Sequence, residues 1–174
     1  MAINSTIHKV SLDIADMDRH YYHQHELTLA QHPSENNYRF MIRLVAFILN
    51  AHERLSFTKG LCADTEPELW QKALTDEIDL WVELGQVDEK RIRRACGRSK
   101  QVIIYTYHDG KASAWWGQQG KKLARFKNLK VIQLKAEKLE ELAGRTMNLQ
   151  CSIQDGEVYL SDGELTCTIY QKPH

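Results

Sequence analysis

Hydrophobic and polar residues alternate near the N-terminus and predict two strands, over residues 3–15 and 22–32, joined by a polar turn at 16–20. The spacing then becomes helical over residues 35–53, where the apolar side chains fall on one stripe: Met41, Leu44, Val45, Ile48 and Ala51. Ser34, directly before this segment, is expected to cap the helix. The chain is therefore predicted to begin with a long hairpin followed by a core helix.

The middle of the chain predicts a compact series of strands and one helix. The expected elements are a short strand over 55–59 ending at Gly60, a polar loop over 62–67, an ambiguous segment over 69–73, a strand over 78–84, a helix over 88–96 and a strand over 102–107. Asp88 is expected to cap the helix and Gly97 to end it. The nearly continuous apolar run of 102–107 is typical of a central strand buried on both faces.

The last third predicts helices alternating with strands and then strands alone. The expected elements are helix 112–119, strand 129–134, helix 137–143, and strands 147–153, 157–160 and 165–170. Strand–helix–strand spacing indicates a right-handed parallel crossover, and the Asp-Gly pairs at 155–156 and 162–163 predict antiparallel hairpins. We expect the 174 residues to form one α/β (α+β) domain, a mixed β-sheet with flanking helices.

Composition narrows the class of protein. Lys plus Arg and Asp plus Glu both number 23, so the net charge is zero, and any affinity for nucleic acid must come from a local patch. No run approaches the roughly 18 apolar residues of a membrane span, and the N-terminus lacks the features of a signal peptide. We expect a cytoplasmic protein that is not bound to a membrane. The four cysteines form no CxxC pair, so reduced and mostly buried thiols are expected, Cys62 among them.

Two histidines form a weaker candidate for a metal site. His23 and His25 would share one face of the second predicted strand and could hold a metal ion. No third ligand is evident in the sequence, so an ordinary pair of surface histidines is the favoured interpretation.

Charge is segregated in the middle third of the chain. Nine acidic residues and one basic residue lie between Asp64 and Glu89, whereas six basic residues and no acidic one lie between Lys90 and Lys100. Carboxylates suit Mg²⁺, and neighbouring cations would neutralise charge on a phosphate. The same pattern is also consistent with charge balance within the protein.

Spacing limits which acids can act together. Asp79 and Glu83 are on one face of the predicted strand 78–84, but their Cα atoms would lie roughly 13 Å apart. A metal at Glu83 would more readily take a second carboxylate from an adjacent strand or from the segment 66–68. On the following helix Arg91, Arg94 and Arg98 fall on one stripe, which either binds phosphate or forms a solvated face.

Several segments resemble the bacterial YaeQ family. They are residues 29–35 (LAQHPSE), 60–70 (GLCADTEPELW), 78–85 (IDLWVELG), 88–96 (DEKRIRRAC) and 145–156 (RTMNLQCSIQDG), which together span most of the chain. The resemblance implies a variant of the restriction-endonuclease-like PD-(D/E)XK fold. In that core a helix precedes a three-stranded antiparallel meander, a second helix and a fourth strand, to which the N- and C-terminal hairpins would be additions.

The superfamily implies metal-dependent phosphodiester hydrolysis, although the family itself brings no settled activity. Its third strand carries an acid followed two residues later by lysine, whereas Glu83 is followed by glycine at position 85. Arg91, Arg94 or Lys59 would have to supply the missing cation, or the site is inactive as a nuclease. Glu35 matches an extra helical acid of some superfamily members.

We therefore predict a nuclease-like site with Glu66, Asp79 and Glu83 as Mg²⁺ ligands and with Arg91 and Arg94 facing phosphate. Lys59 and Glu35 are further members of this site. The alternative is an inactive module that uses the same site to bind nucleic acid or a protein. The chain is expected to be a monomer or a weak dimer.

Overall fold

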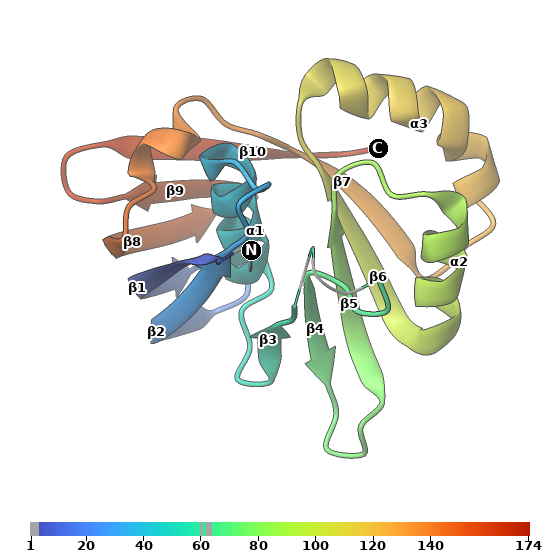
Figure 1. The fold of residues 1–174 in the computed structure, drawn as a ribbon, viewed down its shortest axis with the longest axis horizontal. Coiled ribbons are helices and arrows are strands. Elements are labelled where there is room, and N and C mark those ends of the chain that lie inside the picture. The colour runs from blue at the N-terminus through green and yellow to red at the C-terminus, as the bar shows by residue number, and fades with distance from the viewer. Residues whose placement is uncertain (1–3, 60, 62–63) are drawn as a thin grey trace. The chain divides into compact units, whose positions relative to one another are not determined.

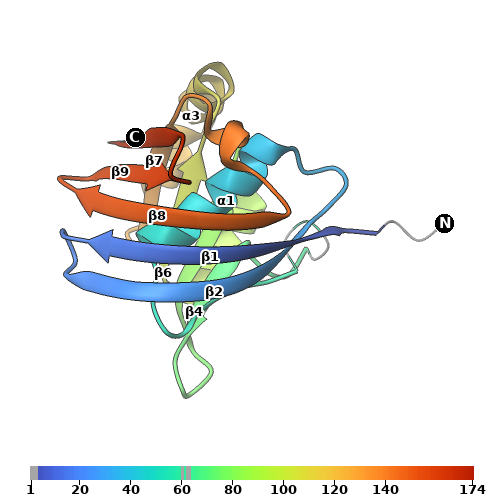
Figure 2. The same ribbon diagram turned by 90° about the vertical axis from the view of Figure 1, so that its left-hand side faces the viewer.

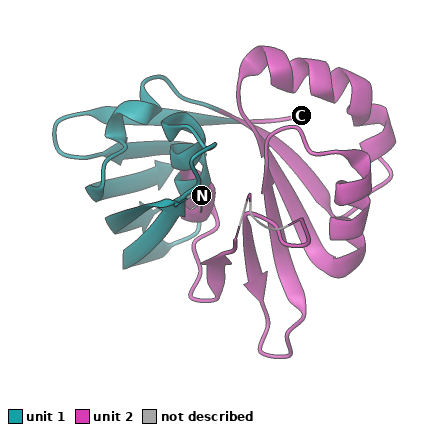
Figure 3. Cartoon of the chain, viewed as in Figure 1, with its two compact units in different colours: residues 1–44, 135–171 teal, residues 45–134, 172–174 magenta. Residues whose placement is uncertain are grey.

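The computed structural model describes residues 4–59, 61 and 64–174. The chain divides into two compact units (Figure 3). Unit 1 contains the described residues up to Leu44 together with Lys135–Gln171, and unit 2 contains Val45–Leu134 with Lys172–His174. Helix α1 (Asn37–Leu49) contributes to both units.

Unit 1 is built on a mixed sheet in which the N- and C-terminal strands join. Its strands are β1 (Thr6–Asp16), β2 (Tyr21–Gln31), β8 (Thr146–Gln154), β9 (Glu157–Ser161) and β10 (Thr166–Pro173). They follow the order β2-β1-β8-β9-β10, and β1 pairs in parallel with β8 (Figure 2). The two terminal hairpins predicted from the sequence therefore form one sheet, because β1 and β8 share a ladder.

The hairpin predictions for unit 1 are confirmed. Strands β1 and β2 pair antiparallel along their whole length, and Asp155 and Gly156 take the left-handed φ values of 52° and 78° that a tight turn between β8 and β9 requires. The helix predicted over 137–143 is instead a single turn of 3₁₀-helix, η2 (Leu139–Leu142), which buries Leu139 and Leu142. A segment this short cannot propagate an α-helix.

Unit 2 is built on five strands that follow one another in the strand order. Its strands are β3 (Leu55–Phe57), β4 (Leu69–Lys72), β5 (Ile78–Leu84), β6 (Ser99–Thr106) and β7 (Leu129–Lys135). The order is β7-β6-β5-β4-β3, with β3, β4 and β5 antiparallel and β5, β6 and β7 parallel (Figure 1). Helices α2 (Glu89–Arg98) and α3 (Asp109–Leu123) make the two parallel crossovers, as the spacing predicted.

Both faces of the central strand β6 are covered. On one face α2 and α3 pack against the sheet (Figure 1), through a buried cluster of Ile92, Ile104, Trp115, Leu123 and Val131. On the other face Asn50, just after α1, donates to the Tyr105 hydroxyl at 2.8 Å. This confirms the prediction of a two-sided strand and the α/β class. Within the described residues there are three α-helices and ten β-strands, parallel in some pairs and antiparallel in others.

Several predicted boundaries are wrong for local reasons. Helix α1 begins at Asn37 because the Asn36 side chain, not that of Ser34, caps it by accepting from the Arg39 N–H at 2.8 Å. The Ser34 hydroxyl instead lies 2.6 Å from His32 Nδ1. Helix α2 continues past Gly97 to Arg98, because the glycine is tolerated inside the last turn.

Other elements differ in length from the predicted ones. Strand β3 is shorter than predicted and ends at Phe57, while Gly60 lies outside the described residues. The ambiguous segment 69–73 is strand β4, and α3 extends well beyond the predicted 112–119 on both sides.

The cysteine prediction holds where it can be examined. Cys151 and Cys167 are buried, Cys96 is half-buried, and all three are free thiols. Burial raises the pKa of Cys151 to about 12 and that of Cys96 to about 11. Cys62 lies outside the described residues. No α-helix in the described part of the chain has the length and apolar character needed to cross a membrane.

Candidate functional site

Glu83 is a buried carboxylate near the end of β5. Its exposed fraction is only 4%, and two donors converge on the same oxygen: Trp81 Nε1 at 2.8 Å and Arg91 Nε at 2.7 Å from Oε1. Burial raises the pKa of Glu83, and the hydrogen bond and positive charge of Arg91 oppose that rise. Oε1 is thus held in place, and Oε2 is the oxygen that neither donor uses.

Arg91 links helix α2 to the polar segment that precedes β4. Its terminal nitrogens donate to the backbone oxygens of Asp64 at 2.8 Å and Glu66 at 2.7 Å. About two turns further along α2, Arg98 donates to the Thr65 oxygen at 3.2 Å. Two arginines of the predicted stripe therefore hold residues 64–66, and Arg91 alone also reaches Glu83.

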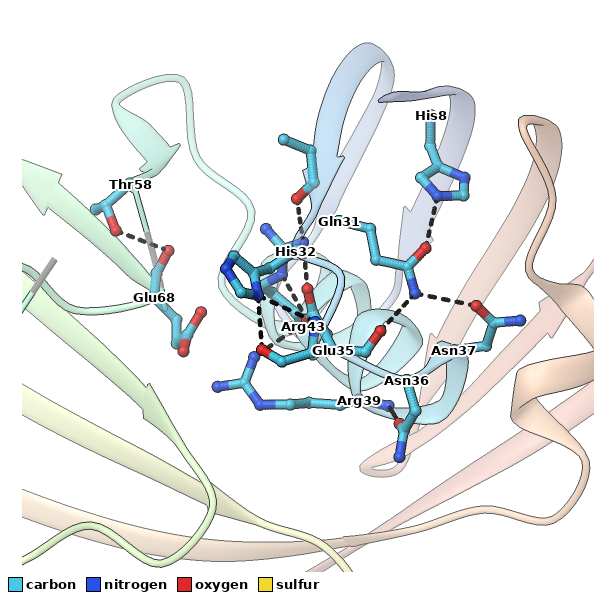
Figure 4. A network of polar contacts seen from close by, with 12 residues as sticks. His8, Gln31, His32, Glu35, Asn36, Asn37, Arg39, Arg43, Thr58 and Glu68 are labelled. Carbon is cyan, nitrogen blue, oxygen red and sulfur yellow. Dashed lines mark hydrogen bonds and ion pairs between the residues drawn. The ribbon is translucent and has the colours of Figure 1, made fainter. Parts of the chain in front are cut away.

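Glu68 is the second acid of this site. It precedes β4 and its N–H donates to the Val82 oxygen at 3.0 Å, so the antiparallel register that pairs Leu69 with Val82 places Glu68 beside Glu83. Glu68 is buried, and its charge contributes to the raised pKa of Glu83. The Thr58 hydroxyl lies 3.5 Å from the Glu68 backbone oxygen (Figure 4).

Sequence reasoning selected Glu66 for this position and missed Glu68. The Glu66 carboxylate instead lies 3.4 Å from the Lys59 backbone nitrogen, and the Lys59 side chain is exposed. The signal that could have identified Glu68 was strand β4. Once 69–72 is read as a strand antiparallel to β5, residue 68 falls opposite residue 83.

Asp79 lies apart from the pair. Its carboxylate forms ion pairs with Lys100 at 3.2 Å and Arg54 at 3.9 Å, at the other end of β5 from Glu83. Arg94 is exposed, and within the described part of the chain it makes no ion pair. Of the cations predicted to face phosphate, Arg91 therefore adjoins the acids and Arg94 faces solvent.

Glu35 belongs to unit 1, where its side chain lies beside arginines of helix α1 (Figure 4). It is buried, and both of its carboxylate oxygens accept from Arg43 at 3.1 Å. Arg39, one helical turn before Arg43, adds a third contact at 3.1 Å. Two arginines thus neutralise the Glu35 charge locally.

Gly85, in the place of the superfamily lysine, has a structural reason to be glycine. Its φ is +86°, a left-handed value that side chains with a Cβ rarely adopt, and an added Cβ would lie 3.8 Å from the Tyr107 ring. A lysine could not occupy this position without changing the end of β5.

The donor set fits one kind of metal ion. Among the described residues no three His, Cys, Asp or Glu side chains converge on one point. Mg²⁺ needs only one or two carboxylates and takes its other oxygens from water and substrate, so Glu68 and Glu83 are the candidate protein ligands for such an ion.

The comparisons with known proteins agree with this architecture over nearly the whole chain. The model of the YaeQ protein family matches residues 1–171. The chain belongs to the YaeQ family. Its resemblance to that family, predicted from the motifs, is confirmed.

Named members of the YaeQ family are similar along their full length. The chain is 46% identical to the uncharacterised protein YaeQ of Escherichia coli K12, over 99% of both chains. The crystal structure of YaeQ from Xanthomonas axonopodis pv. citri superposes with a TM-score of 0.94 at 42% identity, covering 98% of each chain. That of Pseudomonas syringae YaeQ superposes with a TM-score of 0.90 at 29% identity, covering 97% of this chain and 95% of that one.

Proposed function

We propose that this YaeQ-family protein is a divalent-metal-dependent phosphodiesterase that acts on nucleic acid through Glu68 and Glu83. One observation carries the proposal: two buried carboxylates, one directly before β4 and one on β5, lie opposite each other, and an arginine contacts the second. Like charges are costly to bury together, so such a pair is unusual unless a cation is to be bound there.

The order of elements supports a variant of the PD-(D/E)XK core. Helix α1 is followed by the antiparallel strands β3, β4 and β5, then by α2 and by β6 parallel to β5. This is the order that the resemblance implies for the core. Fold likeness alone does not define an activity, so the acids carry the proposal.

Mg²⁺ would be held by Glu68 and by Oε2 of Glu83, and when bound it would supply a Lewis acid for the phosphate. The protein's own residues prepare the site. The Trp81 N–H fixes the Glu83 carboxylate, and β4 brings Glu68 to it. Arg91, whose guanidinium donates to Glu83 and to the backbone oxygens of residues 64 and 66, would supply positive charge beside the acids, where Gly85 supplies none.

Replacing each acid with its uncharged amide tests this proposal. Glu83→Gln and Glu68→Gln keep size and lose the ligand charge, so Mg²⁺-dependent cleavage of single- and double-stranded DNA and RNA should fall by about a hundredfold or more. Glu77→Gln, which changes an exposed acid just before β5, is the matched control and should cleave as the wild type does. Calorimetric titration of Mg²⁺ or Mn²⁺ into the wild type and each variant measures the affinity for the metal ion separately from cleavage.

Asp79→Asn tests the acid that only the sequence selected. Because the Asp79 carboxylate pairs with Lys100 and Arg54, cleavage should be retained. Equal rates in the wild type and both glutamine variants would refute the role of Glu68 and Glu83.

An inactive nucleic-acid-binding module is the second candidate function. It is favoured by the close Arg91–Glu83 ion pair, which satisfies the acid without a metal, and by the missing lysine. That candidate predicts no cleavage under any metal, together with salt-dependent oligonucleotide binding that Arg94→Ala weakens.

A further inference from the structure

Three side chains that the proposed function does not use gather on β2, which lies at one end of the strand order of unit 1. The rings of His23 and His25 lie 4.7 Å apart between centroids, and the Tyr21 ring lies 6.0 Å from the first and 6.1 Å from the second. Alternation along the strand puts all three on one face. Three candidate ligands, two imidazoles and a phenol, are thus adjacent on one regular strand, so no loop has to become ordered to bring them together.

Two of the donor atoms already have the separation of ligands that share an ion. The Tyr21 hydroxyl oxygen lies 2.8 Å from His25 Nε2. Ligand bonds of about 2.0 Å meeting at angles between square and tetrahedral put neighbouring donor atoms about 3 Å apart. A metal ion could therefore bridge these two atoms with little movement of the strand.

The partner strand β1 places mainly apolar side chains beside these rings. On β1 the residues opposite His25 and His23 are Leu12 and Ile14, both buried. The Asp16 carboxylate, opposite Tyr21, is occupied by Arg19 at 2.6 Å.

We propose that His23, His25 and Tyr21 form a binding site for a borderline transition-metal ion, of which Zn²⁺ is the representative. Imidazole and phenol donors suit Zn²⁺ rather than Mg²⁺. Two histidines and one tyrosine would leave one position of a tetrahedral ion for water. The site is separate from Glu68 and Glu83 and stands whether or not that pair is active.

The experiment is calorimetric titration of the full-length protein with Zn²⁺. The wild type should bind one ion through these residues, and His23→Asn and His25→Asn should each weaken binding by at least tenfold, since loss of even an outer-sphere partner costs about 10- to 100-fold. Tyr21→Phe should weaken binding as well. His20→Asn is the matched control, because His20 has a φ of 55° that asparagine tolerates, and it should bind as the wild type does.

A second measurement uses the wild type alone and so does not depend on the folding of a variant. Cu²⁺ added to labelled protein should broaden the imidazole NMR signals of His23 and His25 before those of the other six histidines. Absence of Zn²⁺ binding by the wild type, equal affinity in the His25→Asn variant, or broadening centred on other histidines would each overturn the proposal.

Discussion

Glu83 carries its charge in a place where charge is costly. Its side chain is 5% exposed and that of Arg91 is 25% exposed, so the pair lies at the border between interior and solvent. Burial raises the pKa of Glu83, and Arg91 is the largest opposing influence. The ionised form is therefore tolerated because one guanidinium is present, and losing that guanidinium would leave a buried charge uncompensated.

Arg91→Gln should destabilise the fold in a pH-dependent way. A carboxyl group whose folded-state pKa is raised stabilises the fold below its unfolded pKa and loses that contribution as the pH rises through the folded value. The variant raises this pKa further. We expect a loss of about 3 kcal/mol in the free energy of unfolding at pH 8 and about 1 kcal/mol near pH 4, measured by urea denaturation.

The control for this prediction is Arg94→Gln. Arg94 is exposed on the same helix, so its replacement should change stability by less than about 0.5 kcal/mol at either pH. A loss in Arg91→Gln that is equal at both pH values would show that Glu83 does not respond to the arginine.

At the scale of elements, the start of α2 determines where Arg91 lies. The Asp88 side chain caps this helix by accepting from the backbone N–H of Arg91 itself, at 2.9 Å. The capping contact and the ion pair with Glu83 therefore share one residue. The cap of α2 therefore helps to position Arg91 for its ion pair, and β5 carries the partner carboxylate, Glu83.

Asp88→Ala should cost about 1 kcal/mol of stability, because it leaves an amide at the helix start without its side-chain acceptor. Asp88→Asn keeps an acceptor oxygen and should lose less. Lys90→Ala, an exposed change in the first turn of the same helix, is the control and should be close to neutral. Thermal unfolding of the three variants measures the difference, and equal midpoints for Asp88→Ala and Lys90→Ala would contradict it.

At the scale of the whole molecule, zero net charge has a consequence for solubility. Equal numbers of acidic and basic residues, 23 of each, leave no mutual repulsion between copies near neutral pH. Solubility should therefore be lowest near pH 7 and rise on both sides. Precipitation with ammonium sulfate at several pH values measures it.

A charge-shifted variant checks that prediction. Lys111 and Lys122 are both exposed on α3. Replacing both with glutamate should move the solubility minimum to lower pH without a large effect on the fold. If the solubility minimum of the variant stayed near pH 7, the minimum would not be caused by zero net charge.

The sequence by itself determined the elements and their local connections. Alternation predicted β1, β2 and β5, the Asp-Gly pair predicted the turn at 155–156, and helical spacing predicted α1 and α2. These features depend on residues that lie within a few positions of one another, and the hydrophobic pattern of the sequence contains that information. The same local pattern selected Glu83 and Arg91 as candidate site residues, and the structure places them 2.7 Å apart.

Only the tertiary structure decided which distant residues meet. The parallel pairing of β1 with β8 joins segments that lie far apart in the sequence. The placement of Glu68 beside Glu83 depends on the register of β4, a segment whose secondary structure the sequence pattern left ambiguous. The left-handed backbone at Gly85, the position at which the superfamily pattern has lysine, likewise appears only in the structure, at the end of β5. Register sets which side chains face each other across a sheet, and a one-residue change would turn every one of them to the opposite face.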